Sequence, residues 1–248
     1  MTRLKARYRV DFFGISDVGL VRTQNEDAWY VAPDAALYLL ADGMGGHNAG
    51  EVAANLAVEF LVDYVKRKPP PEGKQIDYFK EAISATNRHL YEKGEANSNL
   101  RGMGTTLCMV HFQNSHACIA HVGDSRIYRF QNKKLEQLTE DHNLAQELAT
   151  LGTLSNEPAQ LSSFKNVLTR AVGTNATVKP TLQEVECHLG DLFLLCSDGL
   201  SNYVKDSQIK DIILQSTSLE QRGQRLVELA KEQGGGDNIT LVLMQLEA

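Results

Sequence analysis

The chain has 248 residues, of which 42% are hydrophobic and 23% are charged, a composition typical of a globular protein with a substantial core. Its net charge of −6, with no run rich in lysine and arginine, gives no basic footprint for nucleic acid. No apolar stretch approaches the roughly 20 residues that span a bilayer, and the basic N-terminus lacks the apolar segment of a signal peptide, so we expect a cytoplasmic protein without membrane contact.

The N-terminal part of the chain shows both strand and helix patterns. Imperfect alternation predicts a strand over 8–15, a short strand over 29–31 follows, and the apolar run 36–41 predicts a buried strand. Apolar residues at a spacing of 3.6 predict amphipathic helices over about 50–68 and 77–93. Three prolines end the first helix, and a glycine ends the second.

Three strand-like segments in quick succession, 105–112, 116–122 and 126–130, predict an antiparallel meander. The stretch of about 141–177, which has a short helical pattern at its start but otherwise no clear periodicity, is expected to form a variable flap. The remaining predicted elements are strands over 182–188 and 192–196, helices over about 206–215 and 219–233, and a final strand over 239–246. Because no repeat or linker divides the chain, residues 1–248 are expected to form one domain with antiparallel sheet and helices outside it.

Several other residues are expected to have structural roles. The four cysteines form no C-x-x-C pair and lie in strand-like runs, which predicts buried free thiols rather than a zinc site or a disulfide framework. The glycine of the stretch 103–106 is expected to permit close strand packing, and residues 125–126 to shape the turn after Asp124.

Acidic residues recur at the ends of the predicted strands. The positions are Asp42, Asp124, Asp198 and Asp237, each beside a glycine, with Glu26 and Asp27 at a strand start. Strands of one sheet can bring their ends together, and converging carboxylates repel one another unless a cation lies among them. All-oxygen ligands favour Mg²⁺ or Mn²⁺, and two such ions about 3.5–4 Å apart activate a bridging water for attack on phosphorus. A nearby arginine could hold the phosphate through its bidentate fork.

Six motifs follow one another along the chain. They are Val21-Arg22-x-x-Asn25-Glu26-Asp27-Ala28, Ala41-Asp42-Gly43-Met44-Gly45-Gly46-His47-x-x-Gly50-Glu51-Val52-Ala53, Met103-Gly104-Thr105-Thr106, His121-Val122-Gly123-Asp124-Ser125-Arg126, Cys196-Ser197-Asp198-Gly199-Leu200 and Gly236-Asp237-Asn238-Ile239-Thr240. Together they resemble the ordered motifs of the metal-dependent type 2C (PPM) protein phosphatases in their bacterial form, over essentially the whole chain. The resemblance implies an α+β fold, in which two antiparallel β-sheets pack as a sandwich flanked by helical layers, with the flap beside a metal cleft. It also implies hydrolysis of phosphoserine and phosphothreonine in proteins by a water that bridges two Mn²⁺ or Mg²⁺ ions, without a covalent phosphoenzyme.

The same resemblance implies roles for individual residues at the metal centre. Asp42 matches the carboxylate that bridges the two tightly bound metals, and the carbonyl of Gly43 matches a further ligand. Asp198 and Asp237 match the remaining acids on the first metal. Glu26 and Asp27 correspond to acids that act mostly through metal-bound waters.

Three further roles follow from the resemblance. Asp124 matches a ligand of a third, weaker metal, which Asp198 would share. Arg22 matches the arginine that binds the substrate phosphate, and His47 matches the histidine proposed as general acid. Asn166 stands where some members of the family place a serine near the third metal.

The resemblance also implies phosphorylated protein substrates and an opposing serine/threonine kinase, and we expect a monomer. Two alternatives stay open from the residues. One is an inert pseudophosphatase that only binds phosphoproteins, which the retained acids at 42, 198 and 237 disfavour. The other keeps the chemistry but acts on a small-molecule phosphoester, because the sequence shows no extra domain that would recruit a protein. A thiolate mechanism is disfavoured, since no cysteine lies in a phosphate-binding C-x₅-R loop.

Overall fold

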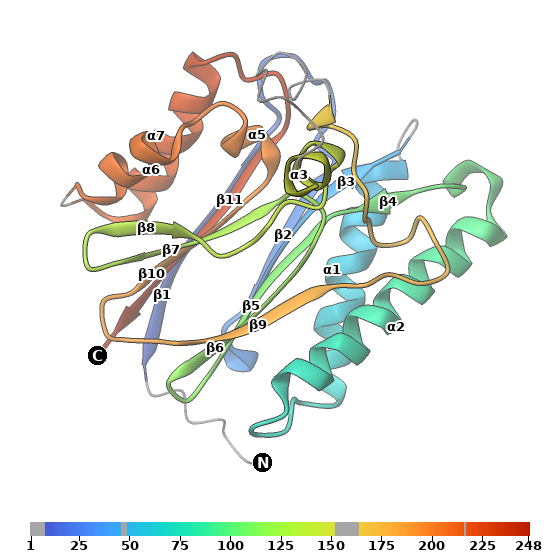
Figure 1. Ribbon diagram of the computed structural model, residues 1–248, viewed down its shortest axis with the longest axis horizontal. Coiled ribbons are helices and arrows are strands. Elements are labelled where there is room, and N and C mark those ends of the chain that lie inside the picture. Colours follow the sequence, from blue (N-terminus) through green and yellow to red (C-terminus); the bar gives the residue numbers. More distant parts are fainter. Residues whose placement is uncertain (1–7, 46–48, 152–163, 216) are drawn as a thin grey trace.

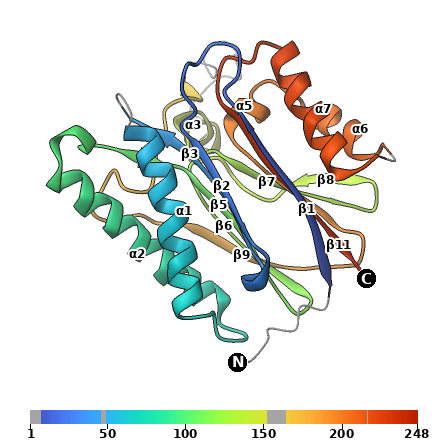
Figure 2. The same cartoon turned by 180° about the vertical axis from the view of Figure 1, so that it is seen from behind.

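Two antiparallel β-sheets pack face to face with helices on both outer sides (Figures 1 and 2). The computed structural model describes residues 8–45, 49–151, 164–215 and 217–248. One sheet has the order β1 (Arg9–Asp17), β11 (Ile239–Glu247), β10 (Leu192–Cys196), β7 (Arg126–Gln131) and β8 (Lys134–Gln137). The other has the order β2 (Asp27–Ala32), β3 (Leu37–Met44), β5 (Leu107–Gln113), β6 (His116–Val122) and β9 (Thr181–Glu186), with the short β4 (Gly104–Thr105) also paired to β3. The predicted sandwich is confirmed.

The long helices cover the outer faces of the two sheets. Helices α1 (Ala49–Arg67) and α2 (Gln75–Ala96) lie against the sheet that contains β3, and α6 (Asp206–Ile213) and α7 (Leu219–Glu232) lie against the sheet that contains β11 (Figure 2). The short helices α3 (Leu144–Thr150) and α5 (Asp198–Ser201) lie at one end of the sandwich. No helix of the described residues is long and apolar enough to cross a membrane.

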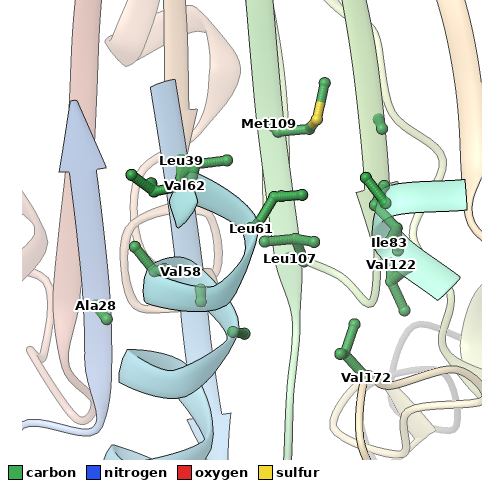
Figure 3. Close-up of a cluster of buried hydrophobic side chains, with 14 of the residues drawn as sticks. Ala28, Leu39, Val58, Leu61, Val62, Ile83, Leu107, Met109, Val122 and Val172 are labelled. Atoms are coloured by element: carbon green, nitrogen blue, oxygen red, sulfur yellow. The ribbon is translucent and has the colours of Figure 1, made fainter. Parts of the chain in front are cut away.

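Strand β3 is apolar throughout because both of its faces are buried. Leu37 and Leu39 face the core under α1 and α2, whereas Tyr38 and Leu40 face the core between the sheets. Figure 3 shows the first of these cores, with Leu61 of α1 beside Leu107 of β5. This burial on two faces fixes the strand firmly, and the strand carries Asp42 near its end.

The predicted meander is wrong at its third strand. β5 and β6 pair along their whole length, but β7 pairs with β10 in the other sheet. The chain crosses between the sheets at Gly123, whose φ is +97° and whose added Cβ would lie 2.6 Å from a side-chain atom of Thr106. Only glycine fits such a turn without strain. The crossing places Asp124 between the two sheets rather than on a hairpin of one.

The remaining differences concern short elements and the face of α1, whose predicted apolar stripe runs through Val52, Leu56, Phe60 and Tyr64, with Ala53 and Leu61 beside it. The sequence patterns missed β8 and α5, which have four residues each, and β4, which has two. Helix α1 buries mainly Ala53, Ala57, Leu61 and Val65, while the aromatic residues Phe60 and Tyr64 are only partly buried. Small residues on the buried face let α1 approach the sheet closely. The four cysteines are buried free thiols, as predicted.

A buried histidine predicts how stability depends on pH. Burial lowers the pKa of His111 to about 4, from an unfolded value near 6.5, so the unfolded chain binds more protons between these values and stability falls as the pH falls. Between pH 7.5 and 5 this group should cost about 2 kcal/mol of the free energy of unfolding. We expect the free energy of unfolding, measured by urea denaturation in EDTA, to fall between pH 7.5 and 5 by about 2 kcal/mol less in His111→Gln than in the wild type. Parallel pH dependence in the two proteins would contradict the expectation.

Candidate active site

A cavity of about 710 Å³ lies at the end of the sandwich where β3 and β10 end and β11 begins. Seven of the nine predicted site residues line it: Arg22, Glu26, Asp42, Gly43, Asp124, Asp198 and Asp237. His47 lies outside the described residues. Another cavity of similar size, about 690 Å³, lies between the far end of β2 and the C-terminal end of α1 and contains none of the predicted site residues.

Three hydrogen bonds hold the backbone of Asp42. Its N–H donates to Oγ1 of Thr106 (2.9 Å), and its carbonyl accepts from the N–H of Thr106 (2.8 Å) and from Oγ1 of Thr105 (2.9 Å). The Thr106 hydroxyl also lies 2.7 Å from that of Ser125. Thr105 and Thr106 of the stretch 103–106 therefore position Asp42, a role that was not predicted for them from the sequence.

Gly43 lies where a side chain would not fit. A Cβ added to it would lie 2.1 Å from the carbonyl oxygen of Gly50 and 2.5 Å from that of Glu26. The Gly43 N–H donates to the same Glu26 carbonyl at 3.1 Å. The start of α1 and the segment before β2 therefore both pack directly against the backbone of Gly43.

Asp198 and Asp237 lie on two segments that pack against each other. Asp198 begins α5, where Asn202 Nδ2 donates to its Oδ2 at 3.0 Å. Asp237 precedes β11 and forms an ion pair with Arg22, with Nη2 2.9 Å from Oδ2. The side chain of Arg22 is 50% exposed, so it can present its remaining N–H groups to a ligand.

Glu26 and Asp27 are adjacent in sequence but have different surroundings. Glu26 lines the cavity, and its N–H donates to Oδ1 of Asn238 at 2.9 Å. Asp27 does not line the cavity, and its Oδ2 accepts from the hydroxyl of Ser197 at 2.9 Å. Burial raises the pKa of Asp27 to about 7, although hydrogen bonds from Thr240 and Ser197 act in the opposite direction.

The pKa values of Asp42, Asp124 and Asp198 are all raised. Burial, and then the charges of Asp27 and Asp198, raise the pKa of Asp42 well above its usual range. Burial and Asp237 raise the pKa of Asp198 to about 6, and burial and Asp198 raise that of Asp124 to about 7. These carboxylates are therefore crowded enough to oppose one another's ionisation, and a cation among them would relieve that repulsion.

The donor set fits hard divalent cations. Every predicted ligand is an oxygen, which suits Mg²⁺ or Mn²⁺. In the described part of the chain, no three acidic, histidine or cysteine side chains are gathered as a ready-made set of metal ligands. Mg²⁺ keeps several of its waters and takes only one or two carboxylates directly, so ions of this kind do not require a closed protein cage.

Several residues at the site were not predicted from the sequence. Asn202 and Tyr203 line the cavity, and Asn238 donates from Nδ2 to the carbonyls of Val18 (3.0 Å) and Gln24 (2.9 Å). Asn238 thereby ties the loop that carries Arg22 to the start of β11. Asn202 follows Asp198 by four residues, a spacing that places two side chains on the same side of a helix. The contact between them could have been predicted if α5 had been recognised.

The predicted flap is described in part. Helix α3 and the residues from 164 onward are described, whereas residues 152–163 lie outside the described part of the chain. Its return segment, Asn166, Val167 and Leu168, lines the cavity, and Asn143 pairs with Leu168 in an antiparallel bridge. This places Asn166 at the cavity.

Comparison with known proteins identifies the class. Residues 21–242 match the family model described as protein phosphatase 2C. The chain is 38% identical over 235 residues to the serine/threonine phosphatase stp of Listeria welshimeri, covering 93% of each chain. The chain belongs to the protein phosphatase 2C family.

Solved structures of similar proteins agree with this assignment. The serine/threonine phosphatase Stp1 of Staphylococcus aureus superposes with a TM-score of 0.90 at 33% identity, over 100% of this chain and 98% of the other. The catalytic domain of the serine/threonine protein phosphatase PstP, solved in complex with two manganese ions, superposes with a TM-score of 0.86 at 36% identity, over 96% of this chain and 99% of the other.

Proposed function

We propose that this chain is a metal-dependent protein phosphatase that hydrolyses phosphoserine and phosphothreonine in proteins at a centre of two Mn²⁺ or Mg²⁺ ions. The observation that carries the proposal is the group of carboxylates with raised pKa values around one cavity, in a chain of this family. The fit of Mn²⁺ follows from the all-oxygen donor set, and a similar catalytic domain was solved with two manganese ions.

The proposed ligands divide between tight and weak ions. Asp42 and the carbonyl of Gly43, with Asp198 and Asp237, would hold the two tight ions. Asp124, together with Asp198, would hold a third, weaker ion. Glu26 would act through bound waters at the cavity wall. Asp27 does not line the cavity, so it would support the ligand carboxylates without contacting the ions or their waters.

The side chains would have the following roles in the reaction. When bound, the cations supply an activated water as nucleophile and neutralise charge on the phosphoryl group. Arg22 uses one guanidinium nitrogen on Asp237, and its other N–H groups would hold the phosphoryl oxygens. His47 would protonate the leaving alkoxide, a role predicted from the sequence alone. No residue of the chain needs to form a covalent phosphoenzyme.

The substrate class separates the proposal from its alternatives. We expect the purified protein to release phosphate from phosphothreonine peptides and from phosphorylated protein in Mn²⁺. The matched control is a set of small phosphate monoesters at equal concentration. A pseudophosphatase would bind the phosphopeptide without releasing phosphate, and a small-molecule enzyme would have a higher kcat/KM on the monoesters than on any peptide.

Metal binding should also be visible in stability. Because a cation that binds only the folded state stabilises it by mass action, adding Mn²⁺ should raise the melting temperature of metal-free protein. At a concentration about 100 times the dissociation constant, the expected gain is about 2.7 kcal/mol. Differential scanning fluorimetry in EDTA and in increasing Mn²⁺ measures this shift. An unchanged melting temperature across the titration would contradict binding at the carboxylates.

Three finer assignments belong to the same proposal. We propose that the enzyme is cytoplasmic, which its four free, buried thiols support, since disulfides are rare in a reducing compartment. We propose that it opposes a serine/threonine kinase, which would supply its substrates. We also propose that it acts as a monomer, which light scattering after gel filtration would test.

A further inference from the structure

The turn that carries Asp124 is held by two consecutive residues, Asp141 and His142, that lie between β8 and α3. Asp141 binds Arg126, two residues after Asp124, through two short contacts: Nε to Oδ1 at 2.9 Å and Nη2 to Oδ2 at 2.7 Å. His142 binds Gly123, one residue before Asp124. Its N–H donates to the Gly123 carbonyl at 3.0 Å, and its Nδ1 accepts from the Gly123 N–H at 3.2 Å.

The ring of His142 is fixed on its other sides as well. Its Nε2 lies 3.0 Å from Oγ1 of Thr181, which can accept a hydrogen bond from it, whereas the Arg170 guanidinium, with Nη1 3.2 Å from Nε2, has only donors and is a neighbouring charge. The ring of His121 stacks on it, with the two centroids 4.4 Å apart and the planes 19° from parallel. His121 Nε2 in turn donates to the carbonyl of Glu140 at 2.8 Å.

The contact with the Gly123 N–H determines which nitrogen carries the proton, because a backbone N–H can only donate. Burial, and then the neighbouring His121 and Arg170, lower the pKa of His142 to about 3, so the ring is neutral at physiological pH. A neutral ring that accepts at Nδ1 carries its proton on Nε2, from which it can donate to Thr181. The Nδ1 atom therefore accepts the hydrogen bond from the Gly123 N–H.

His142 also anchors a second segment that lines the cavity. The Thr169 N–H donates to the His142 carbonyl at 2.9 Å, and the next residue, Asn143, bridges to Leu168. Leu168 and its neighbours line the cavity, as does Asp124. One residue thus ties the turn of Asp124 to a second segment that lines the same cavity.

We infer that His142 is a positioning residue for Asp124, acting through the hydrogen bond from the Gly123 N–H to its Nδ1. The inference rests on the proposed function, in which Asp124 helps to hold the third, weaker ion. Without Nδ1, the buried Gly123 N–H loses its partner and the turn relaxes toward another acceptor. The carboxylate then moves relative to Asp198. Residues that hydrogen-bond a metal ligand typically contribute about 10- to 100-fold to metal affinity, and we expect an effect in this range from His142, which holds the residue before Asp124.

Two substitutions separate the hydrogen bond at Nδ1 from the one at Nε2. In His142→Asn, the side-chain oxygen can take the place of Nδ1, and the contact to Thr181 is lost. In His142→Gln, the amide can take the place of Nε2, and the contact to Gly123 is lost. The inference predicts that Asn rescues the site and that Gln does not.

Mn²⁺ binding measured by isothermal titration calorimetry is the primary readout, with turnover on a phosphothreonine peptide against Mn²⁺ concentration as the second. We expect His142→Gln to bind the two tight Mn²⁺ ions as the wild type does, but to bind the third ion with about 10- to 100-fold lower affinity. The Mn²⁺ concentration needed for half-maximal turnover should rise by the same factor. His142→Asn should bind the weak ion close to the wild-type affinity. The control is His188→Gln, at an exposed histidine after β9.

Several results would overturn the inference. They are equal weak-ion affinity in the Asn and Gln variants, wild-type affinity in the Gln variant, and loss of the tight events in the Gln variant. Melting temperatures in EDTA show whether a variant has lost affinity through general unfolding, which would make His142 a packing residue and also overturn the inference. Failure of the proposed function looks different, because the wild type itself would then release no phosphate at any Mn²⁺ concentration.

Discussion

Asp42→Asn should lower turnover on a phosphothreonine peptide by about 10³-fold or more at saturating Mn²⁺. A carboxylate proposed to lie between two ions contributes more than an outer partner, whose loss costs about 10- to 100-fold in affinity or activity. Asparagine has nearly the same shape and keeps the backbone bonds to Thr105 and Thr106, so the turn itself should persist. The measurement is steady-state turnover across a range of Mn²⁺ concentrations.

Stability provides the control for this variant. The pKa of Asp42 is raised by burial and by its acidic neighbours, so replacing it with a neutral amide removes a source of repulsion in the metal-free protein. We therefore expect Asp42→Asn to melt in EDTA at or above the wild-type temperature and to gain less from added Mn²⁺. An inactive variant that melts well below the wild type in EDTA would indicate a folding defect. Near wild-type turnover would rule out Asp42 as a bridging ligand.

Gly199→Ala should cause the second large loss. An added Cβ would lie 1.9 Å from the carbonyl oxygen of Asn238 and 3.5 Å from Cβ of Asp237. Because the first contact is with backbone, α5 and the segment before β11 must separate. The overpacking should cost about 1–3 kcal/mol of the free energy of unfolding. Separating Asp198 from Asp237 by about 1 Å should lower turnover about 10²-fold.

The matched control for this substitution is Gly190→Ala. Gly190 has a φ of +87° and no atom within 4 Å of an added Cβ, and it lies in the turn between β9 and β10. Its replacement should cost about 1 kcal/mol or slightly more through backbone strain and should leave turnover unchanged. Urea unfolding and peptide turnover on both variants measure the difference. Equal loss of turnover in the two variants would contradict the close approach of α5 to the segment before β11.

The sequence was most informative where polar turns bound an apolar run. The bounds of β6 and β10 agree with the predicted strands 116–122 and 192–196, because glycine, serine and asparagine residues mark their ends. The ordered motifs predicted the family, and seven of the nine site residues line one cavity. Four of the six motifs, those of Asp42, Asp124, Asp198 and Asp237, are readable because they place a carboxylate beside a glycine, where backbone and ligand can approach closely.

The sequence could not show which strands pair or which short elements form. Strands β6 and β7 are joined by a tight turn, and only the structure shows that the turn at Gly123 crosses between sheets. Helix α5 is a single turn, too short for a periodic pattern. The different surroundings of Glu26 and Asp27 depend on where β2 begins, and the sequence patterns placed that start two residues too late.

The most direct test of the central claim is phosphate release from a phosphothreonine peptide by one preparation of metal-stripped protein. The protein is assayed in EDTA and then in increasing Mn²⁺, with Asp42→Asn assayed in parallel. The account predicts negligible release in EDTA, a saturable rise with Mn²⁺ in the wild type, and at most a small rise in the variant. Full turnover of the wild type in EDTA, or an equal response to Mn²⁺ in the two proteins, would contradict it.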